Sequence, residues 1–237
     1  MISLTLSLAM LAAPPTPGSV VSAMLARYAN AEKLSGTITF RQSGADRTLA
    51  ITTLVQLDRP HKFYLRQERA GAKQTAIVAA DGTMFTYEVP DSLAKQGGER
   101  LYELQNQRGV VYTVADIYTI GLPGLLDRSP VLDVLVAKNE HLRYVRGQIA
   151  NLAWKDDKAP ADGANRVIVG DWRAYQNAPI SGKYVLTISP QGDLLHWNLK
   201  EFVAVPNQKP ILITSDWAVD VKVGDAGNAS LYRVVRK

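Results

Sequence analysis

The sequence predicts a mainly β protein of the α+β class, built on an antiparallel sheet, and three features predict it. Over most of the chain, apolar residues alternate with polar ones, which is the period of a half-buried strand. The dipeptide Asp81-Gly82 joins two such runs and favours the positive φ angles of a tight hairpin turn. Between Val111 and Ala137 the apolar residues crowd together instead, which indicates short helices that cover one face of the sheet.

The N-terminal part is predicted to be a leader followed by a helix. Met1–Ala13 is apolar and uncharged and is followed by three prolines within four residues, which is typical of a signal peptide, although no Lys or Arg precedes it. We therefore expect residues 1–18 to be a signal peptide with a proline-rich leader, and residues 19–237 to form one domain. A helix is predicted over Ser19–Leu34, with Ser19 as its cap and Gly36 as its stop.

Strands are predicted wherever the period of two returns, with two or three short helices in the punctuated segment between Val111 and Ala137. The expected strands begin at Thr37 and continue as Leu49–Leu57, Lys62–Arg69, Gln74–Ala80, Thr83–Val89, Leu142–Ala153, Arg166–Gly170, Lys183–Ser189, Leu194–Val205 and Ile211–Val223.

Composition and charge exclude several classes of protein. With 46% hydrophobic and 21% charged residues, the chain is an ordinary globular one. The net charge is +5, but Lys and Arg are scattered among acidic residues, so no nucleic-acid partner is predicted. A weak attraction to anionic lipid headgroups stays open. The absence of Cys excludes disulfides, thiolate metal sites and a cysteine nucleophile.

The sequence carries no common catalytic or cofactor motif. Its three histidines, His61, His141 and His196, lie in different predicted strands or turns, and none is spaced from another as metal ligands are. No HExxH, GxSxG or phosphate-binding glycine motif is present. We therefore predict no catalytic residue, no metal and no cofactor.

Five segments, taken in order, resemble the LolA-like family, the periplasmic carriers of outer-membrane lipoproteins and their relatives. The resemblance covers most of Ser19 to Val223. The five segments are LSGTITFRQ (Leu34–Gln42), VQLDRPHKFYL (Val55–Leu65), IVAADGTMFTYEVP (Ile77–Pro90), LLDRSPVLDVLVAK (Leu125–Lys138) and LTISPQGDLLHWNL (Leu186–Leu199).

The resemblance implies an unclosed barrel of about eleven antiparallel strands with helices over its mouth, which binds acyl chains in a hydrophobic cavity without a cofactor. It also implies that Arg59, in the Arg-Pro corner, bonds to the covering helices and helps to determine whether the cavity is open or closed. Without the resemblance, Arg59 is a plain arginine flanking the turn at Pro60. The chain departs from the family in its longer link at Glu99–Val114 and after Val223, and without Cys it has no lipid anchor.

The predicted function is that of a non-enzymatic periplasmic carrier or chaperone that binds a lipid or the acyl chains of a lipoprotein. Membrane-bound donor and acceptor proteins are possible partners, and a monomer is expected. The residues predicted to line the concave face are Ile38, Phe40, Leu49, Ile51, Val55, Leu57, Phe63, Leu65, Phe85 and Tyr87. Those predicted to cover it, besides Arg59, are Ile117, Leu122, Leu125, Leu126, Leu132 and Leu135.

Two other hypotheses stay open at this point. The first is an envelope sensor or interaction domain with a filled core, to which a protein partner docks along an exposed strand. The second is an enzyme whose acidic or histidine groups converge only in space, which a sequence without an alignment does not reveal. A fold of this class does not by itself decide among these functions.

Overall fold

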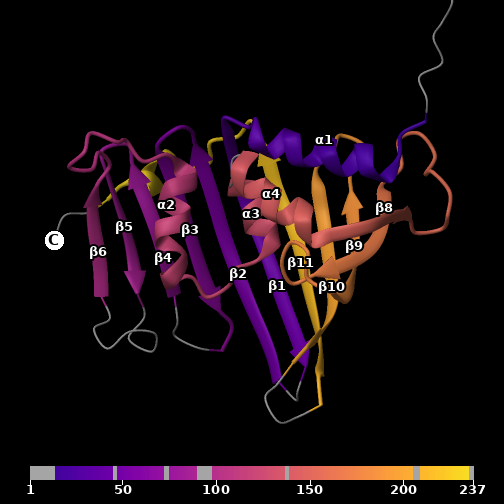
Figure 1. Ribbon diagram of the computed structural model, residues 1–237. Helices are drawn as coiled ribbons and strands as arrows, with labels where there is room; N and C mark the ends of the chain where they lie inside the picture. The colour runs from indigo at the N-terminus through magenta and orange to yellow at the C-terminus, as the bar shows by residue number, and fades with distance from the viewer. Residues whose placement is uncertain are drawn as a thin grey trace, which may run out of the picture.

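The computed structural model describes residues 14–44, 47–71, 75–89, 98–136, 139–204 and 209–234. These residues form one curved antiparallel sheet of eleven strands, with short helices against one of its faces (Figure 1). The strands are β1 (Lys33–Gly44), β2 (Arg47–Asp58), β3 (Lys62–Arg69), β4 (Thr75–Asp81), β5 (Met84–Val89), β6 (Gly98–Glu103), β7 (Ile149–Trp154), β8 (Arg166–Arg173), β9 (Ile180–Ile188), β10 (Leu194–Val203) and β11 (Ile211–Val223).

The sheet consists of two antiparallel meanders, β1–β6 and β7–β11, which are joined at its centre by the pairing of β1 with β11. Its order is β6-β5-β4-β3-β2-β1-β11-β10-β9-β8-β7, so β1 pairs with both the next strand and the last one. Strands β6 and β7 lie at opposite edges and are not paired with each other within the described residues. The predicted fold class, an unclosed antiparallel sheet covered by short helices, is confirmed.

The helices lie over the concave face of the sheet. Helix α1 (Pro17–Ala29) runs across the upper ends of the central strands, while α2 (Val114–Gly121) lies in front of β3, β4 and β5 (Figure 1). A 3-10 turn, η1 (Leu122–Gly124), leads on to α3 (Pro130–Val136) and α4 (Asn139–Gln148), which lie in front of the centre. We call residues 114–136, which comprise α2, η1 and α3, the lid.

Strand alternation places the apolar side chains under these helices. Phe40 faces Ile51 on β2 and Trp217 on β11, and the rings of Phe40 and Trp217 are stacked with centroids 5.0 Å apart. Helix α2 packs onto the same face, with Tyr118 edge-on against Phe63. The strand and helix side chains form one continuous core cluster. A smaller hydrophobic cluster lies on β3 and β4. In it, Tyr232 of η2 (Ala229–Tyr232) packs against side chains of these two strands.

The predicted boundary of the first helix was wrong at both ends. Helix α1 begins at Pro17, because the side chain of Thr16, not Ser19, caps it by accepting a hydrogen bond from the Ser19 backbone N–H. It ends at Ala29, and Leu34 belongs to β1 instead. Leu34 lies at helical spacing from the residues before it and equally fits the alternation of the strand that follows, and tertiary packing selects the strand.

Two further predictions were corrected in the second half of the chain. The segment Leu142–Ala153, predicted as a strand, is helix α4 up to Gln148 and strand β7 only from Ile149. Leu142 and Val145 are buried three residues apart, which suits one face of a helix. The expected long link at Glu99–Val114 contains edge strand β6, whose residues Leu101 and Tyr102 are exposed and give little alternation.

The predicted leader lies largely outside the described residues, which begin at Pro14. Of the residues assigned to it, Pro17 and Gly18 form the start of α1, and the extent of the leader stays a prediction. Among the described helices, none has the length and apolar character needed to cross a membrane.

Gly36 is required where β1 and β11 approach each other most closely. It lies opposite Val55 on β2 and Val221 on β11, and a Cβ atom there would overlap the backbone carbonyl oxygen of Asp220. We expect Gly36→Ala to lower the free energy of unfolding by about 1–3 kcal/mol, since the backbone must shift to admit the methyl group. Urea denaturation followed by circular dichroism measures this change.

Gly18→Ala is the matched control, because nothing lies within 4 Å of the Cβ atom it would add to α1. We expect no loss of stability there, and a gain of up to about 1 kcal/mol from the better helix former. Equal unfolding free energies for the two variants would show that the β1–β11 contact is not tight.

Candidate functional site

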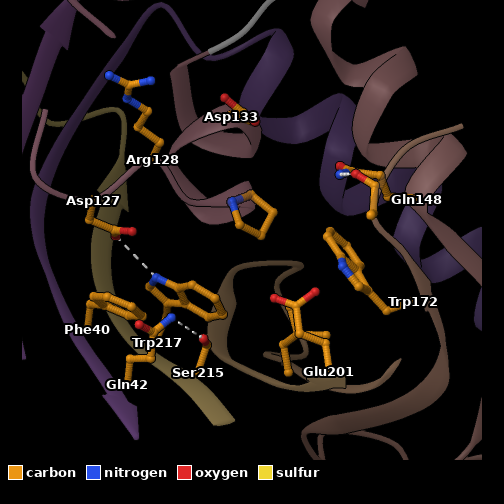
Figure 2. A pocket seen from close by; sticks show the side chains of 13 residues that line it. Phe40, Gln42, Asp127, Arg128, Asp133, Gln148, Trp172, Glu201, Ser215 and Trp217 are labelled. Carbon is orange, nitrogen blue, oxygen red and sulfur yellow. Dashed lines mark hydrogen bonds between the residues drawn. The ribbon is translucent and has the colours of Figure 1, made fainter. Parts of the chain in front are cut away.

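A cavity of about 300 Å³ opens on the concave face below the lid (Figure 2). Three strands supply its floor in pairs of inward-facing residues: Phe40 and Gln42 from β1, Leu199 and Glu201 from β10, and Ser215 and Trp217 from β11. The 127–133 segment, Gln148 and Trp172 complete its walls. The cavity therefore lies between the lid and the central seam of the sheet.

Each strand that forms the floor changes from apolar to polar on the same side. Along β1 the inward residue after Phe40 is Gln42, and along β10 the one after Leu199 is Glu201. The Gln42 side-chain amide donates to the Ser215 hydroxyl at 3.1 Å, which joins β1 to β11 at this level. The concave face is thus apolar beneath the helices and polar at its open end.

Aromatic rings separate these two regions. The stacked pair Phe40 and Trp217 lies at the cavity floor, and Trp172 lies at its far wall (Figure 2). Trp172 also packs edge-on against the fully buried Trp197, with ring centroids 5.9 Å apart. A ligand in the cavity would therefore contact both flat apolar rings and polar groups.

Asp127 is the most buried carboxyl group of the cavity and belongs to the turn between η1 and α3. Its side chain accepts a hydrogen bond from the Trp217 indole N–H at 3.2 Å. Its exposed fraction is only 7%, and this burial raises its pKa to about 6, although the hydrogen bonds from Trp217 and Ser129 act in the opposite direction. The carboxyl group of Asp127 therefore holds its proton more strongly than an exposed aspartic acid does.

The backbone of the same turn is held by Gln67 of β3. The Gln67 amide oxygen accepts from the backbone N–H groups of Leu126 and Asp127, at 2.7 and 3.0 Å. The amide nitrogen donates to the Asp127 carbonyl oxygen at 2.9 Å and to the Thr53 hydroxyl at 3.3 Å. All four hydrogen bonds that an amide can make are formed, so this buried polar group joins lid and sheet without an unsatisfied atom.

Two further carboxyl groups line the cavity. Asp133, on α3, accepts a hydrogen bond from the Tyr118 hydroxyl at 3.0 Å. Burial raises the pKa of Glu201, opposed by a hydrogen bond from Trp172. Among the described residues no three His, Cys, Asp or Glu side chains gather closely enough to hold a metal ion. The groups present can bind the polar part of a ligand through hydrogen bonds.

The Arg59-Pro60 corner joins the lid to the rest of the molecule at its other end. The largely buried guanidinium donates from Nε to the Ala31 carbonyl oxygen at 2.9 Å and from Nη2 to the Val136 carbonyl oxygen at 3.0 Å. The Pro60 carbonyl oxygen accepts from the backbone N–H of Val114 at 2.9 Å. One corner therefore contacts the residues after α1, the last residue of α3 and the first residue of α2.

The residues predicted from the sequence lie together, but inside the packed core and not around the open cavity. Of the ten predicted lining residues, eight are buried, and Leu49 and Tyr87 are partly buried. Of the six predicted covering residues, Leu122 and Leu126 are partly buried and the others are buried. Only Phe40 among these sixteen also lines the cavity. Their roles toward a ligand stay predictions, since contact with one requires the lid to move.

The sequence reasoning missed Trp217, Asp127 and Gln67. A signal for Trp217 was present, because it lies two residues before Val219 and thus on the inward side of β11. Gln67 likewise follows Leu65 with the spacing of an inward residue. Nothing in the sequence around Asp127 indicates that its carboxyl group is buried against an indole 90 residues away.

Comparison with known proteins finds similarity only among solved structures. No family model and no curated protein matches the chain. A LolA superfamily protein from Nitrosomonas europaea is similar over 89% of this chain and 94% of its own, at 9% identity and a TM-score of 0.33. A domain from Vibrio parahaemolyticus, named for outer-membrane lipoprotein sorting, is similar over 92% and 98%, at 11% identity and a TM-score of 0.30.

A DUF1329 family protein from Desulfovibrio piger is similar over 93% of this chain and 98% of its own, at 7% identity and a TM-score of 0.30. The expected resemblance to the LolA-like family is thus found again, as a likeness of fold. At these identities and TM-scores the comparison carries no argument about function, which rests on the geometry of the site.

Because of the raised pKa of Asp127, we expect the folded state to be less stable at neutral pH than in mild acid. Between about pH 4 and pH 6 the folded protein keeps a proton that the unfolded chain has already lost, so the free energy of unfolding falls as the pH rises. Asp127→Asn cannot ionise and should remove this fall. Near pH 7 we expect the free energy of unfolding of the variant to be higher than that of the wild type by up to about 3 kcal/mol, since one pKa unit corresponds to about 1.4 kcal/mol.

Urea unfolding at a series of pH values measures this effect, with Asp156→Asn in an exposed turn as the control. The control should follow the wild type at every pH. An unchanged pH dependence in Asp127→Asn would mean that Asp127 ionises normally in the folded protein.

Proposed function

We propose that this chain is a non-enzymatic carrier or chaperone that binds acyl chains between the concave face of the sheet and the lid. The observation that carries the proposal is the way the lid is held. Most of its buried side chains, among them Ile117, Leu132 and Leu135, are apolar, and the Arg59-Pro60 corner, Gln67 and the Asp127–Trp217 pair make polar connections to the sheet.

An acyl chain can replace part of the lid on the sheet at comparable energy. A chain of about sixteen carbons gains roughly 12 kcal/mol when fully buried, at about 0.8 kcal/mol for each methylene group. Six buried apolar side chains at about 2 kcal/mol each are worth the same, and the lid buries ten, so the chain offsets the release of about half of them. Such an exchange is close to neutral, which suits a protein that must both take up and release its ligand.

The polar cavity supplies the other half of an amphiphile site. An acyl chain under the lid would leave its polar end at the open margin, beside Gln42, Gln148 and the carboxyl groups of Asp127 and Glu201. The stacked Phe40 and Trp217 rings lie where the polar and apolar parts of such a ligand would join. A ligand of this kind is either a lipid or the acylated end of a lipoprotein.

Periplasmic location forms part of the proposal and is supported by the leader predicted for residues 1–18. A carrier there would act as a monomer and exchange its ligand with membrane-bound donor and acceptor proteins. The covering helices suit this role because their release exposes the binding face only while a ligand or partner is at hand.

Charges placed in the η1–α3 turn should abolish lipid binding. Leu125 is buried and Leu126 partly buried against the concave core, so the double substitution Leu125→Asp with Leu126→Asp would put two charges in the path of the acyl chain. We expect wild-type protein, purified from cells, to carry acyl lipid and the variant to carry at least tenfold less. Native mass spectrometry followed by extraction and lipid analysis measures both.

The matched control is Leu101→Asp with Val110→Asp, two exposed apolar positions in β6 and in the loop that follows. It should keep its lipid, and circular dichroism should show that both variants are folded. A bare polypeptide mass for the wild type, together with failure to bind added palmitate, would contradict the carrier proposal and favour the envelope interaction domain.

Loss of the Arg59 guanidinium should make the lid open more readily. Arg59→Met keeps the aliphatic stem but removes both hydrogen bonds, to Ala31 and to Val136. We expect palmitate with a fluorescent label to enter at least fivefold faster, as judged by stopped-flow fluorescence. Arg66→Met, which removes an exposed arginine paired with Glu68, should leave the rate unchanged. Equal rates in all three proteins would limit Arg59 to a structural role.

A further inference from the structure

An exposed apolar patch with two lysines occupies the lower end of the sheet, on the face opposite the polar cavity. It consists of Ile180, Lys183, Lys200, Phe202 and Leu212, and we call it the tip patch. Its three apolar side chains are exposed by 49%, 60% and 48% for Ile180, Phe202 and Leu212. These fractions are high for large apolar residues that lie side by side.

The strand register brings these residues together and sets the side on which they lie. Phe202 on β10 is directly opposite Leu212 on β11, and Lys200 is directly opposite Lys183 on β9. Lys200 and Phe202 alternate with Leu199 and Glu201, which line the cavity on the concave side. The tip patch is therefore on the convex side of the same strand ends.

The position of the patch leaves it open to a flat surface. Strands β10 and β11 extend, together with β1 and β2, well below the other strands of the sheet (Figure 1). No helix in the described part of the chain packs on this end of the convex face, whereas η2 packs on β3 and β4. The patch therefore forms an open hollow at the protruding end of these strands.

The charge around the patch is positive. Lys183 is paired with Asp171 at 3.0 Å but keeps most of its side chain exposed, and Lys200 has no ion-pair partner among the described residues. The nearest acidic group further along the convex face of β11, Asp216, is paired with His196. A patch of apolar side chains beside lysines suits a membrane interface. The apolar side chains enter the headgroup boundary, and the lysines contact anionic lipids.

A protein partner fits the patch less well. Stable protein interfaces take about 20–30 residues from each side, and lysine is depleted at their centres. Here three apolar side chains are exposed at the ends of three neighbouring strands, with lysines directly beside them. Shallow insertion into a membrane surface, by contrast, needs only a few apolar side chains and gains from each lysine.

We propose that the tip patch docks this protein onto anionic membrane surfaces, through Ile180, Phe202 and Leu212 flanked by Lys183 and Lys200. This docking does not depend on the acyl-chain site. It places the polar cavity, on the other side of the same strands, next to the membrane.

Flotation of the full-length protein with vesicles tests the proposal. We expect binding to vesicles of equal parts phosphatidylglycerol and phosphatidylcholine, and much weaker binding to phosphatidylcholine alone. Phe202→Ser with Leu212→Ser should weaken binding at least tenfold. Lys183→Gln and Lys200→Gln should each weaken it about fivefold, since a lysine near an anionic surface contributes about 1 kcal/mol. Raising the salt concentration from about 0.1 M to about 1 M, which shortens the screening length from ~10 Å to ~3 Å, should also weaken binding to the vesicles.

The control is Leu101→Ser with Val110→Ser, an exposed apolar pair elsewhere on the molecule, which should bind as the wild type does. All substituted positions are exposed, so circular dichroism should show an unchanged fold. Absence of vesicle binding by the wild type, or equal loss in the control, would overturn the proposal. So would a dimer in sedimentation analysis that the Phe202/Leu212 variant abolishes, since the patch would then join two copies. Lipid retention in native mass spectrometry reports separately on the acyl-chain site.

Discussion

Hydrogen bonds from one largely buried guanidinium connect α3 with the segment that follows α1. Arg59 donates to the carbonyl groups that follow α1 and end α3, two segments more than a hundred residues apart, and the corner that carries it also accepts the first N–H of α2. Hydrogen bonds from a charged donor contribute about 1.5–3 kcal/mol, more than neutral ones. Against this, burial of a cation that has no carboxylate partner among the described residues is costly, and it lowers the pKa of Arg59.

The concave face has a polarity gradient that follows from strand alternation alone. Every inward position is two residues from the next, so a change from Phe40 to Gln42, or from Leu199 to Glu201, changes the chemistry of the face without changing the fold. The deeper part is covered by the lid, whereas the outer part carries hydrogen-bonding groups. Asp127 lies at the boundary, where its carboxyl group accepts a hydrogen bond from the Trp217 indole N–H.

Most of the strands were predictable because alternation is a local property. Ile38, Phe40, Ile51 and Val55 were expected on one face, and all are buried there. The failures occurred where a local pattern fits two structures: Leu34 suited helix and strand, and Leu142 with Val145 suited a buried helix face as well as a strand.

The cavity was beyond prediction for a different reason. Its defining contacts, Gln67 with the 126–127 backbone and Trp217 with Asp127, join segments about 60 and 90 residues apart, and no spacing in the sequence encodes such pairs. The predicted covering residues, by contrast, only needed to be apolar and helical to be found.

The connectivity of the chain has a mechanical consequence for the helices. The lid and α4 lie in the single stretch that leads from β6 at one edge of the sheet to β7 at the other, so both ends of this stretch are tethered to the edges of the sheet. A flap hinged at one end could swing far into solvent, but this segment can only bow outward, as a strap does. Displacement is therefore bounded, and return is an intramolecular event at high effective concentration. Flattening of the sheet would draw the strap tight, and deeper curvature would slacken it, so that the shape of the sheet and the access to its interior are coupled by the chain itself.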